Sequence, residues 1–276
     1  MTMCVYWKDK TNNIHMATDS RLSNGVSVLD HCLKISKLNC EVHECNDLSG
    51  ENKVFIRRVN LAISFCGGFV SAYTIKESLT EILNQMVLFP DSSHISMDLI
   101  TDVALMVYDK VVRAAVEYSN SKSGACSFYI AGFCPKANEM EMYKLSVRVN
   151  PSQDGFYCFK EKCFQTNDYI IDGSGATFLM KTDTLDNHFK KAYSINQKMP
   201  LLDLLLLVIN DGTCDTVGGA IQYAKCDPND NIINSMYENN NGQIRYMRGG
   251  VDLNKLIDEC SAQGVVIEAK MIGEQS

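Results

Sequence analysis

The sequence predicts an α+β fold in which two mainly antiparallel sheets pack face to face and helices cover their outer surfaces. The first observation is alternation: several short runs place apolar and polar residues in turn, as half-buried strands do, while other stretches have the period of amphipathic helices. The second is order along the chain, because strands, a helix pair, strands, a second helix pair and strands follow one another in blocks. Blocks of like elements favour layered α+β packing over a parallel strand–helix repeat.

Two hairpins are expected at the start of the chain. Residues 3–7 and 14–18 are strand-like, and the polar stretch KDKTNN joins them. Residues 34–45 and 53–66 flank NDLSGEN, in which Asn, Asp, Ser and Gly are turn formers. These two runs predict a second, longer hairpin.

A pair of helices should follow, separated by the polar stretch DSSH, whose oxygens can cap a helix. Each helix has an apolar stripe with helical spacing on one face. The stripe residues are Ile75, Leu79, Ile82 and Met86 in the first helix, and Leu99, Val103, Met106, Val107, Val111 and Ala114 in the second.

The rest of the chain continues the block pattern. The expected elements are strands at 127–133 and 141–149, a third run ending at residues 169–171, helices at about 175–193 and 199–211, strands around 217–225 and 243–247, a short helix near 252–262 and a final apolar run, GVVIEA. No repeat or low-complexity linker divides the sequence. We therefore expect a single domain over residues 1–276, with a core of about 2–225 and a C-terminal extension, 226–276.

Composition excludes several classes of protein. The 276 residues are 46% hydrophobic and 21% charged, a balance that argues against a disordered, collagen-like or coiled-coil chain. With 26 basic against 33 acidic side chains the net charge is -7, so no nucleic-acid partner is expected. The longest apolar cluster, LLDLLLLVI, is far shorter than the roughly 20 residues of a membrane span, and the N-terminus has no signal pattern. We expect a cytoplasmic protein with no membrane partner.

The twelve cysteines contain no CxxC pair and are expected to be free, mostly buried thiols. Cys40, His43 and Cys45 lie close together in the sequence, which raises the question of zinc. On a strand, however, Cys40 and Cys45 point to opposite faces, and no fourth ligand accompanies them. Neither a metal nor an organic cofactor is expected.

Thr2 is the first candidate for chemistry. A small second residue is the circumstance in which Met1 is removed, which would leave Thr2 at the N-terminus. A terminal Thr joins a hydroxyl nucleophile to an α-amine with a pKa of about 8, so the amine can serve as the base for its own hydroxyl. Taken alone, Met-Thr is only a common start, and the DSR at residues 19–21 is equally consistent with a solvated turn holding a surface ion pair.

Together these segments form a more specific pattern. MTMCVYW, a polar turn and HMATDSRLSNG resemble the opening of proteasome β-subunits and, more closely, of the bacterial proteasome-like Anbu proteins. The resemblance implies an N-terminal nucleophile (Ntn) hydrolase, a four-layer αββα sandwich, with Thr2 as the nucleophile. It also implies that Asp19 orients a catalytic lysine and that Arg21 is held in a nearby ion pair.

Two lysines compete for the catalytic position of that family. Lys34 in LKISKL lies at about the family spacing after Asp19, whereas Lys53 in NKVFIRR lies at about the family spacing before a Gly pair. Antiparallel partners keep a constant index sum, and a turn within NDLSGEN then places Lys34 opposite Ser64 and Lys53 opposite Cys45, near the hairpin tip. In the family the lysine faces the residue three before the first Gly of the pair. This register favours Lys34, with Lys53 as the alternative.

Two strand-to-helix turns match the family in addition. SFCGGFV implies that the amide of Gly67 donates to the developing oxyanion. Phe65 and Phe69 would then flank the pocket for the residue before the scissile bond, which implies an apolar or aromatic preference. YIIDGSGATF places Ser174 on the serine that helps to position the terminal amine.

The last motif, CDTVGGAI, departs from the family pattern D-x-x-[ST]-GG. Aligning the Gly pair puts Cys214 at the Asp and Val217 at the hydroxyl residue, so Asp215 lies one step from the catalytic position. Anbu-like sequences have a TVG stretch at this point, which residues 216–218 match.

The resemblance implies a proteasome-type threonine peptidase that cleaves peptide bonds in peptides or unfolded proteins once Met1 is removed. It further implies a homo-oligomer, as a ring or open ring, with an unfoldase as a candidate partner. Two alternatives stay open because fold does not fix activity: a catalytically inactive assembly or interaction subunit of the same fold, and an amidase that acts on a non-peptide substrate.

Overall fold

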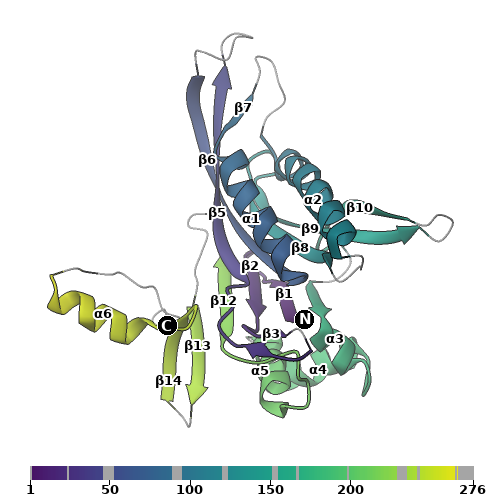
Figure 1. Cartoon of the computed structure of the whole chain (residues 1–276), viewed down its shortest axis with the longest axis vertical. Coiled ribbons are helices and arrows are strands. Elements are labelled where there is room, and N and C mark those ends of the chain that lie inside the picture. Colours follow the sequence, from purple (N-terminus) through teal and green to yellow (C-terminus); the bar gives the residue numbers. More distant parts are fainter. Residues whose placement is uncertain are drawn as a thin grey trace.

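A computed structural model describes residues 2–23, 25–45, 53–88, 95–119, 124–150, 155–165, 168–197, 199–228, 235–240, 243–264 and 266. Two large sheets dominate this part of the chain, and Figure 1 shows helices beside each of them. All of the strand pairs in the two sheets are antiparallel except one, so the α+β class expected from the sequence is confirmed.

The first sheet contains the N-terminal hairpin. Its strand order is β11 (Tyr169–Gly173), β1 (Met3–Lys8), β2 (Ile14–Thr18), β12 (Ile221–Cys226), β13 (Ser235–Asn240), β14 (Gln243–Arg248) and β15 (Val251–Asp252). The strands β1 and β2 lie inside the sheet and are buried along almost their whole length. The N-terminal segment is therefore held on both sides.

The second sheet contains the long hairpin. Its order is β10 (Gly155–Lys162), β9 (Glu139–Asn150), β8 (Cys126–Cys134), β6 (Lys53–Gly67), β5 (Ile35–Cys45) and β7 (Met86–Leu88), with β7 parallel to β5. A small separate pair, β3 (Leu22–Ser23) and β4 (Val28–Leu29), follows the first hairpin.

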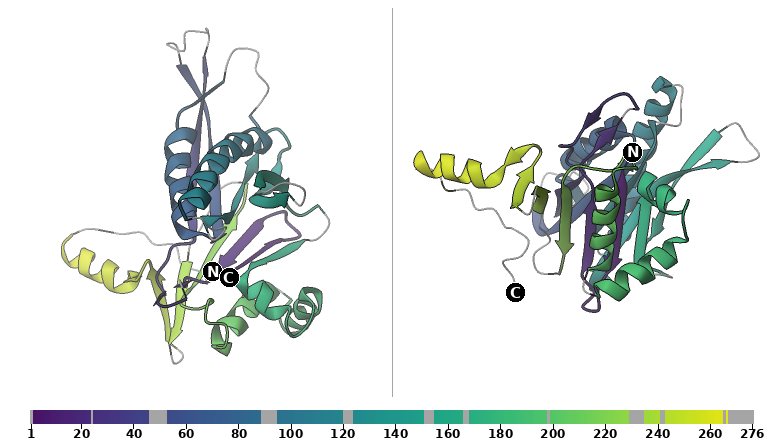
Figure 2. Two further views of the ribbon diagram at one scale, coloured as in Figure 1. Left: turned by 45° about the vertical axis from the view of Figure 1, so that its right-hand side comes forward. Right: turned by 90° about the horizontal axis from the view of Figure 1, so that it is seen from below.

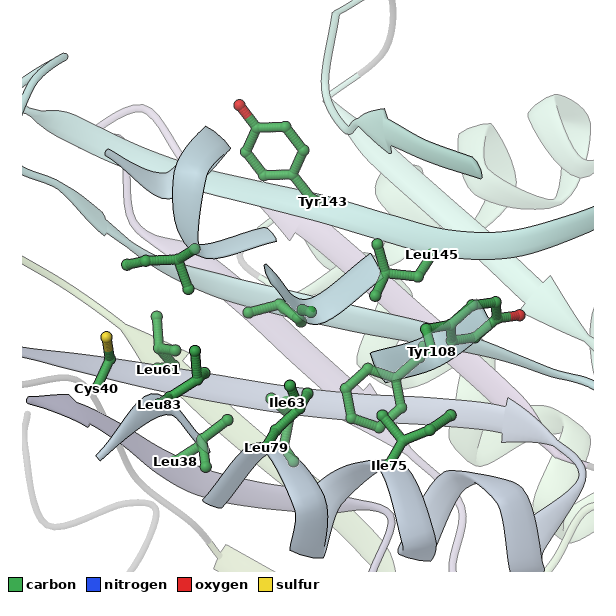
Figure 3. Close-up of a cluster of buried hydrophobic side chains, with 14 of the residues drawn as sticks. Leu38, Cys40, Leu61, Ile63, Ile75, Leu79, Leu83, Tyr108, Tyr143 and Leu145 are labelled. Atoms are coloured by element: carbon green, nitrogen blue, oxygen red, sulfur yellow. The ribbon is translucent and has the colours of Figure 1, made fainter. Parts of the chain in front are cut away.

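Three apolar cores hold the layers together. One lies between the six-stranded sheet and the helices α1 (Phe69–Leu83) and α2 (Met97–Ser119), and Figure 3 shows part of it, with Ile75 and Leu79 of α1 packed against Leu61 and Ile63 of β6. A second joins the seven-stranded sheet to α3 (Ser174–Leu179), α4 (Leu185–Ile195) and α5 (Pro200–Asp211). The third lies between the two sheets, so the sheets face one another and the helices cover their outer faces.

The last helix, α6 (Leu253–Ala262), is different because none of its residues is fully buried. It follows β14 and β15 and extends away from the layered body (Figure 2). Among the described residues, no single helix is long and apolar enough to span a membrane; α4 and α5 together pass that test only as a pair bent by 108°.

Several expected elements need correction. The helix expected over 175–193 is two helices, because the chain turns after Leu179 and Thr184 caps α4 by accepting a hydrogen bond from the Asn187 amide. The strand run expected to end at residue 171 is likewise two strands, β10 and β11, which belong to different sheets. The strands β3, β4, β7, β13 and β15 were not expected. The DSSH and NDLSGEN segments lie outside the described residues, as does most of the final apolar run.

The helix faces are also shifted from those expected. In α1, Ile82 is exposed and Met86 belongs to β7, while Leu83 is buried. In α2, Met106 is 69% exposed, and the buried face consists of Met97, Ile100, Thr101, Ala104, Tyr108 and Val112. The apolar band of α2 is wide because the helix contacts α1 as well as β8, β9 and β10. Periodicity alone could not choose which edge of such a band is buried.

Candidate active site

Thr2 lies at the point where the two sheets meet. It precedes β1, is only 3% exposed and is followed by Met3, whose amide donates to Asp19 Oδ1 at 2.9 Å. Asp19 follows β2 directly, and the pairing of Cys4 with Thr18 in the hairpin brings the two ends together. The local hairpin therefore positions both the hydroxyl residue and the carboxylate that the sequence indicated.

Lys34 completes a buried cluster with these two residues. Its ammonium donates to Thr2 Oγ1, to Asp19 Oδ1 at 2.9 Å and to the carbonyl oxygen of Arg21 at 2.6 Å. The side chains of Lys34 and Asp19 have no exposed surface. An ammonium has three donors, so the three acceptors satisfy it completely and hold its charge beside the hydroxyl.

Asp19 is the centre of this hydrogen-bond network. Besides Met3 and Lys34 at Oδ1, it accepts at Oδ2 from the amides of Arg21 at 3.0 Å and Gly218 at 3.1 Å. A buried carboxylate is tolerated when it is paired and fully hydrogen-bonded, as it is here. The carboxylate links the start of β1, the end of β2 and the loop before β12.

The structure settles which lysine reaches the hydroxyl. Lys53 is exposed and pairs with Cys45, as expected, at the outer part of the long hairpin. The expected pairing of Lys34 with Ser64 is wrong by one residue, because Ile35 faces Ser64. The reason is a bulge: β6 has one additional residue, Ile56, where the register shifts between Val42 and His43 of β5.

Ser174 contacts the backbone of Thr2 from the other side. The Thr2 nitrogen donates to Ser174 Oγ at 3.1 Å, and Ser174 Oγ lies 3.2 Å from the Thr2 carbonyl oxygen and 2.7 Å from Thr216 Oγ1. Gly173 before it has φ +91, and a Cβ there would lie 2.2 Å from the Thr2 oxygen. Only glycine allows this close approach.

Asp215 does not join the cluster. It is exposed, and its backbone oxygen accepts a hydrogen bond from Arg21 at 3.4 Å. The neighbouring Thr216 reaches Ser174 in its place, so the TVG stretch, and not the displaced aspartate, supplies a side chain to the site. Arg21 forms a bidentate ion pair with Asp30 at 2.7 and 2.9 Å, a partner that the sequence analysis did not identify.

The Arg21–Asp30 pair affects both pKa values. The hydrogen bond from Arg21 lowers the pKa of the Asp30 carboxyl, although partial burial opposes this shift. The same hydrogen bond raises the pKa of Arg21. The pair anchors the segment that leads into β3 beside the loop of residues 214–218, since a Cβ on Gly218 would touch the Arg21 guanidinium at 2.4 Å.

Gly67 and Thr2 line one cavity of about 260 Å³, together with Cys66, Asp172, Gly173 and Ser174 and with residues of β8 and β9. Gly67 has φ +104 and is exposed, so its backbone is accessible beside the hydroxyl. Phe65 and Phe69 do not line this cavity. Phe65 is 5% exposed and packs with Phe69 and Tyr73 in the core under α1.

Gln222 is a further site residue that the sequence analysis missed. It is fully buried; its Oε1 accepts from the amides of Lys34 at 2.8 Å and Ile35 at 3.2 Å, and its Nε2 donates to the carbonyl oxygens of Cys32 and Asp19 at 2.7 and 3.3 Å. Its amide therefore fixes the start of β5 against β2. A glutamine on an apolar strand, IQYAKC, is the signal that was available.

The described residues contain no cluster of three or more His, Cys, Asp or Glu side chains suited to a metal ion. Cys40 belongs to the core under α1, and His43 packs edge-on against Phe55. All twelve cysteines are free thiols, and ten are buried. The chemistry available at the site is that of a hydroxyl, a neighbouring ammonium and backbone amides.

Comparison with solved structures finds similarity to Anbu structures. The helical assembly of the Anbu complex from Pseudomonas aeruginosa matches with a TM-score of 0.52 and 14% identity over 95% of this chain and 93% of that chain. Anbu (ancestral beta-subunit) from Yersinia bercovieri matches with a TM-score of 0.48 and 14% identity over 81% of each chain. A Gly-1 mutant of Anbu from Hyphomicrobium sp. strain MC1 matches with a TM-score of 0.49 and 14% identity over 98% and 100%.

The first of these matches shows that the chain has an Anbu-like fold. The resemblance expected from the N-terminal motifs is confirmed at the level of the fold. No family model matches the sequence, and no curated protein matches it.

Proposed function

We propose that this chain is a proteasome-type threonine peptidase of the Anbu-like group, built as a single four-layer αββα Ntn-hydrolase domain. The observation that carries the proposal is the contact of Lys34 Nζ with Thr2 Oγ1 in a cluster whose charges are buried, while the Thr2 nitrogen is hydrogen-bonded to Ser174. The contacts among Thr2, Asp19 and Lys34 support the roles that the family resemblance implies for these residues.

The chemistry begins with removal of Met1, which converts the Thr2 amide nitrogen into an α-amine. The Thr2 hydroxyl oxygen attacks the substrate carbonyl carbon, and its proton passes to the amine, with the Ser174 hydroxyl within reach of both the nitrogen and Thr216. The Lys34 ammonium favours the alkoxide character of the oxygen electrostatically. The amide of Gly67 donates to the oxyanion.

Collapse of the tetrahedral intermediate breaks the carbon–nitrogen bond. The amine returns the proton to the leaving nitrogen, and an ester to Thr2 remains. Water, deprotonated by the same amine, then releases the acid and restores the hydroxyl. Asp19 acts as a positioning residue, since it holds Lys34 and Met3 but does not contact Thr2 Oγ1 by any hydrogen bond within the described part of the chain.

The proposal includes the working form of the protein. The substrates are peptides or unfolded proteins, the chain is cytoplasmic, and it assembles as a homo-oligomer, by analogy with the helical assembly of the Pseudomonas aeruginosa complex. An unfoldase would deliver folded substrates to it. An inactive assembly subunit is the second candidate, favoured by the exposed position of Asp215.

Intact-protein mass and covalent labelling test the proposal. Natively produced protein is expected to lack Met1 and to form one adduct with a β-lactone at Thr2, and the adduct should be lost in Thr2→Ala. Thr74→Ala is the matched control, because Thr74 is an exposed threonine on α1 whose hydroxyl only bonds the Val70 carbonyl. Retained Met1, or a mature chain that forms no adduct, would instead support the inactive subunit.

A further inference from the structure

The cavity beside Thr2 has a chemical character that the motifs did not indicate, and the inference drawn from it rests on the proposed peptidase function. Alternation along β8 and β9 puts Ser127 and Tyr129, and Lys144 and Ser146, on the face that looks toward the seven-stranded sheet. Asp172 on β11 approaches from the opposite sheet, where it pairs with Cys4 of β1. Polar side chains from both sheets therefore gather next to the nucleophile.

An ion pair bridges the two sheets at this point. Lys144 Nζ lies 2.8 Å from Asp172 Oδ2, which also accepts from the Tyr129 hydroxyl, while the Gly173 amide donates to Oδ1 at 2.7 Å. Burial of the Asp172 carboxyl opposes ionisation, but Lys144 and these hydrogen bonds outweigh it and hold the pKa of that carboxyl below its usual value. Burial likewise opposes the charge on Lys144, yet Asp172 raises the pKa of that ammonium. Asp172 thus lines the cavity, and the ammonium of Lys144, which does not line it, neutralises the charge of that carboxylate.

The remaining polar groups of the wall are uncharged hydroxyls. Ser127 and Ser146 line the cavity, Ser146 is 9% exposed, and neither hydroxyl forms a hydrogen bond to any described residue. Each hydroxyl is a donor and an acceptor at once. Beside the apolar Ala125, Cys126 and Val147, the cavity therefore presents unused hydrogen-bonding capacity of both kinds, and the charge of its Asp172 is neutralised by Lys144.

The size and surroundings of the cavity limit what fits. Its volume of about 260 Å³ lies below the roughly 300–1,000 Å³ of small-molecule sites, which suits one substrate side chain. On the α1 side of Gly67, the rings of Phe65, Phe69 and Tyr73 contact one another, and the Tyr73 hydroxyl donates to the Leu33 carbonyl oxygen at 3.2 Å. A separate cavity of about 660 Å³, lined by Gly68 and Phe69 but not by Thr2, lies between α1 and α2. That aromatic cluster occupies the region where the motif favoured an aromatic substrate group.

We infer that this cavity is a subsite for a short, uncharged, hydrogen-bonding side chain (Ser, Thr, Asn or Gln) next to the scissile bond. Ser127 and Ser146 bind the polar end of that side chain, and Asp172 disfavours apolar groups, because packing a hydrocarbon against its carboxylate would remove the remaining solvent from a charged group. Specificity is then set by hydrogen bonds across the sheet interface and not by an apolar pocket.

Positional scanning of the mature enzyme with fluorogenic peptides, varied on both sides of the scissile bond, tests this inference. At one of the two adjacent positions, Ser, Thr, Asn and Gln are expected to exceed Leu and Phe in kcat/KM by about tenfold or more, the order of discrimination that unpaired polar groups impose. Ser146→Ala should reduce this ratio several-fold. Ser194→Ala, which removes an exposed hydroxyl of α4 bonded to the Lys191 carbonyl, should leave the ratio unchanged.

A charge variant provides a second, independent readout. Lys144→Met removes the ammonium and leaves the Asp172 carboxylate without its counter-ion at the cavity wall, so Lys and Arg substrates should gain at least about tenfold relative to Ser. Lys144→Gln serves if the Met variant does not fold. The inference is overturned if the wild-type enzyme prefers Leu or Phe at both positions while the β-lactone still labels Thr2, in which case the proposed function stands. Absence of labelling would overturn both.

Discussion

Lys34 is a charged residue with no exposed side-chain surface. The folded protein tolerates a buried charge of this kind only when its ion-pair and hydrogen-bond partners are present. Its ammonium is shared by Thr2, Asp19 and the Arg21 carbonyl, so position and charge are fixed by the same contacts. The geometry places an obligatory cation next to the proposed nucleophile. Variants of Lys34 and of its partner Asp19 can therefore show separately how this contact affects the free energy of unfolding and how it affects activity.

Lys34→Met should abolish β-lactone labelling and lower the free energy of unfolding by about 3–5 kcal/mol, because the Asp19 charge is left buried without a counter-ion. The double variant Asp19→Asn with Lys34→Met should recover part of that free energy but none of the labelling. Urea denaturation and intact mass measure the two effects. Equal losses of stability in the single and double variants would contradict the buried-pair account.

Lys53→Met is the matched control for this experiment. Lys53 is exposed and lies at the outer part of the long hairpin, where it pairs with Cys45. Labelling should be unchanged, and the free energy of unfolding should stay within about 0.5 kcal/mol of the wild type. A loss of labelling in this variant would indicate that Lys53, and not Lys34, is the catalytic lysine.

At the scale of elements, the hairpin of β1 and β2 carries Thr2 at one end and a second polar network at the other. His15 on β2 lies 2.6 Å from the Tyr223 hydroxyl through Nδ1 and 3.0 Å from Asp9 Oδ2 through Nε2, and its ring stacks on Trp7 at 4.8 Å. A neutral ring that accepts from Tyr223 and donates to Asp9 satisfies both contacts. The network fixes the far end of the hairpin against β12.

This network should make stability depend on pH. Burial lowers the pKa of His15 below its usual value, more than the hydrogen bond to Asp9 raises it. The unfolded chain therefore binds the proton first as pH falls below about 6.5, and the free energy of unfolding decreases until the folded-state pKa is reached. Urea denaturation at pH 7.5 and 5.5 should show a larger loss in the wild type than in His15→Gln. If the free energy of unfolding decreases by the same amount in the wild type and in His15→Gln, His15 is not the cause of the pH dependence.

At the scale of the whole molecule, stability resides in the three cores of the layered body. The helix α6 contributes no fully buried residue and extends away from that body (Figure 2), whereas α5 packs six buried residues against the seven-stranded sheet and its neighbouring helices. The residues after Asp252, which include α6, should therefore be dispensable for the fold.

A chain ending at Asp252 should keep its cooperative unfolding and Thr2 labelling, with a free energy of unfolding within about 1 kcal/mol of the full chain, because little apolar surface is lost from the cores. Leu205→Ala in α5 is the contrasting variant: Leu205 is 0% exposed, and the change should cost about 2–5 kcal/mol. Denaturant titration compares the two. Unfolding of the shortened chain would show that α6 belongs to the core after all.

The sequence by itself determined the α+β class and the two N-terminal hairpins, because alternation and turn chemistry are local signals. The family resemblance of its motifs pointed to Thr2, Asp19, Lys34 (with Lys53 as the alternative) and Ser174 as site residues. Their order along the chain also indicated the Anbu-like fold. Tertiary structure alone decided the rest. The bulge at Ile56 shifted the hairpin register, since nothing in an exposed strand marks an additional residue.

The same limit explains the other differences. Thr216 replaced Asp215 because a loop conformation decides which neighbouring side chain turns inward. Gln222 and the Lys144–Asp172 pair depend on strands from distant parts of the chain meeting face to face. The packing of Phe65 and Phe69 into the core, and not into the cavity, follows from which side of β6 receives α1. Periodicity in the sequence shows that a side chain is buried. Which residues surround that side chain depends on how the sheets and helices pack.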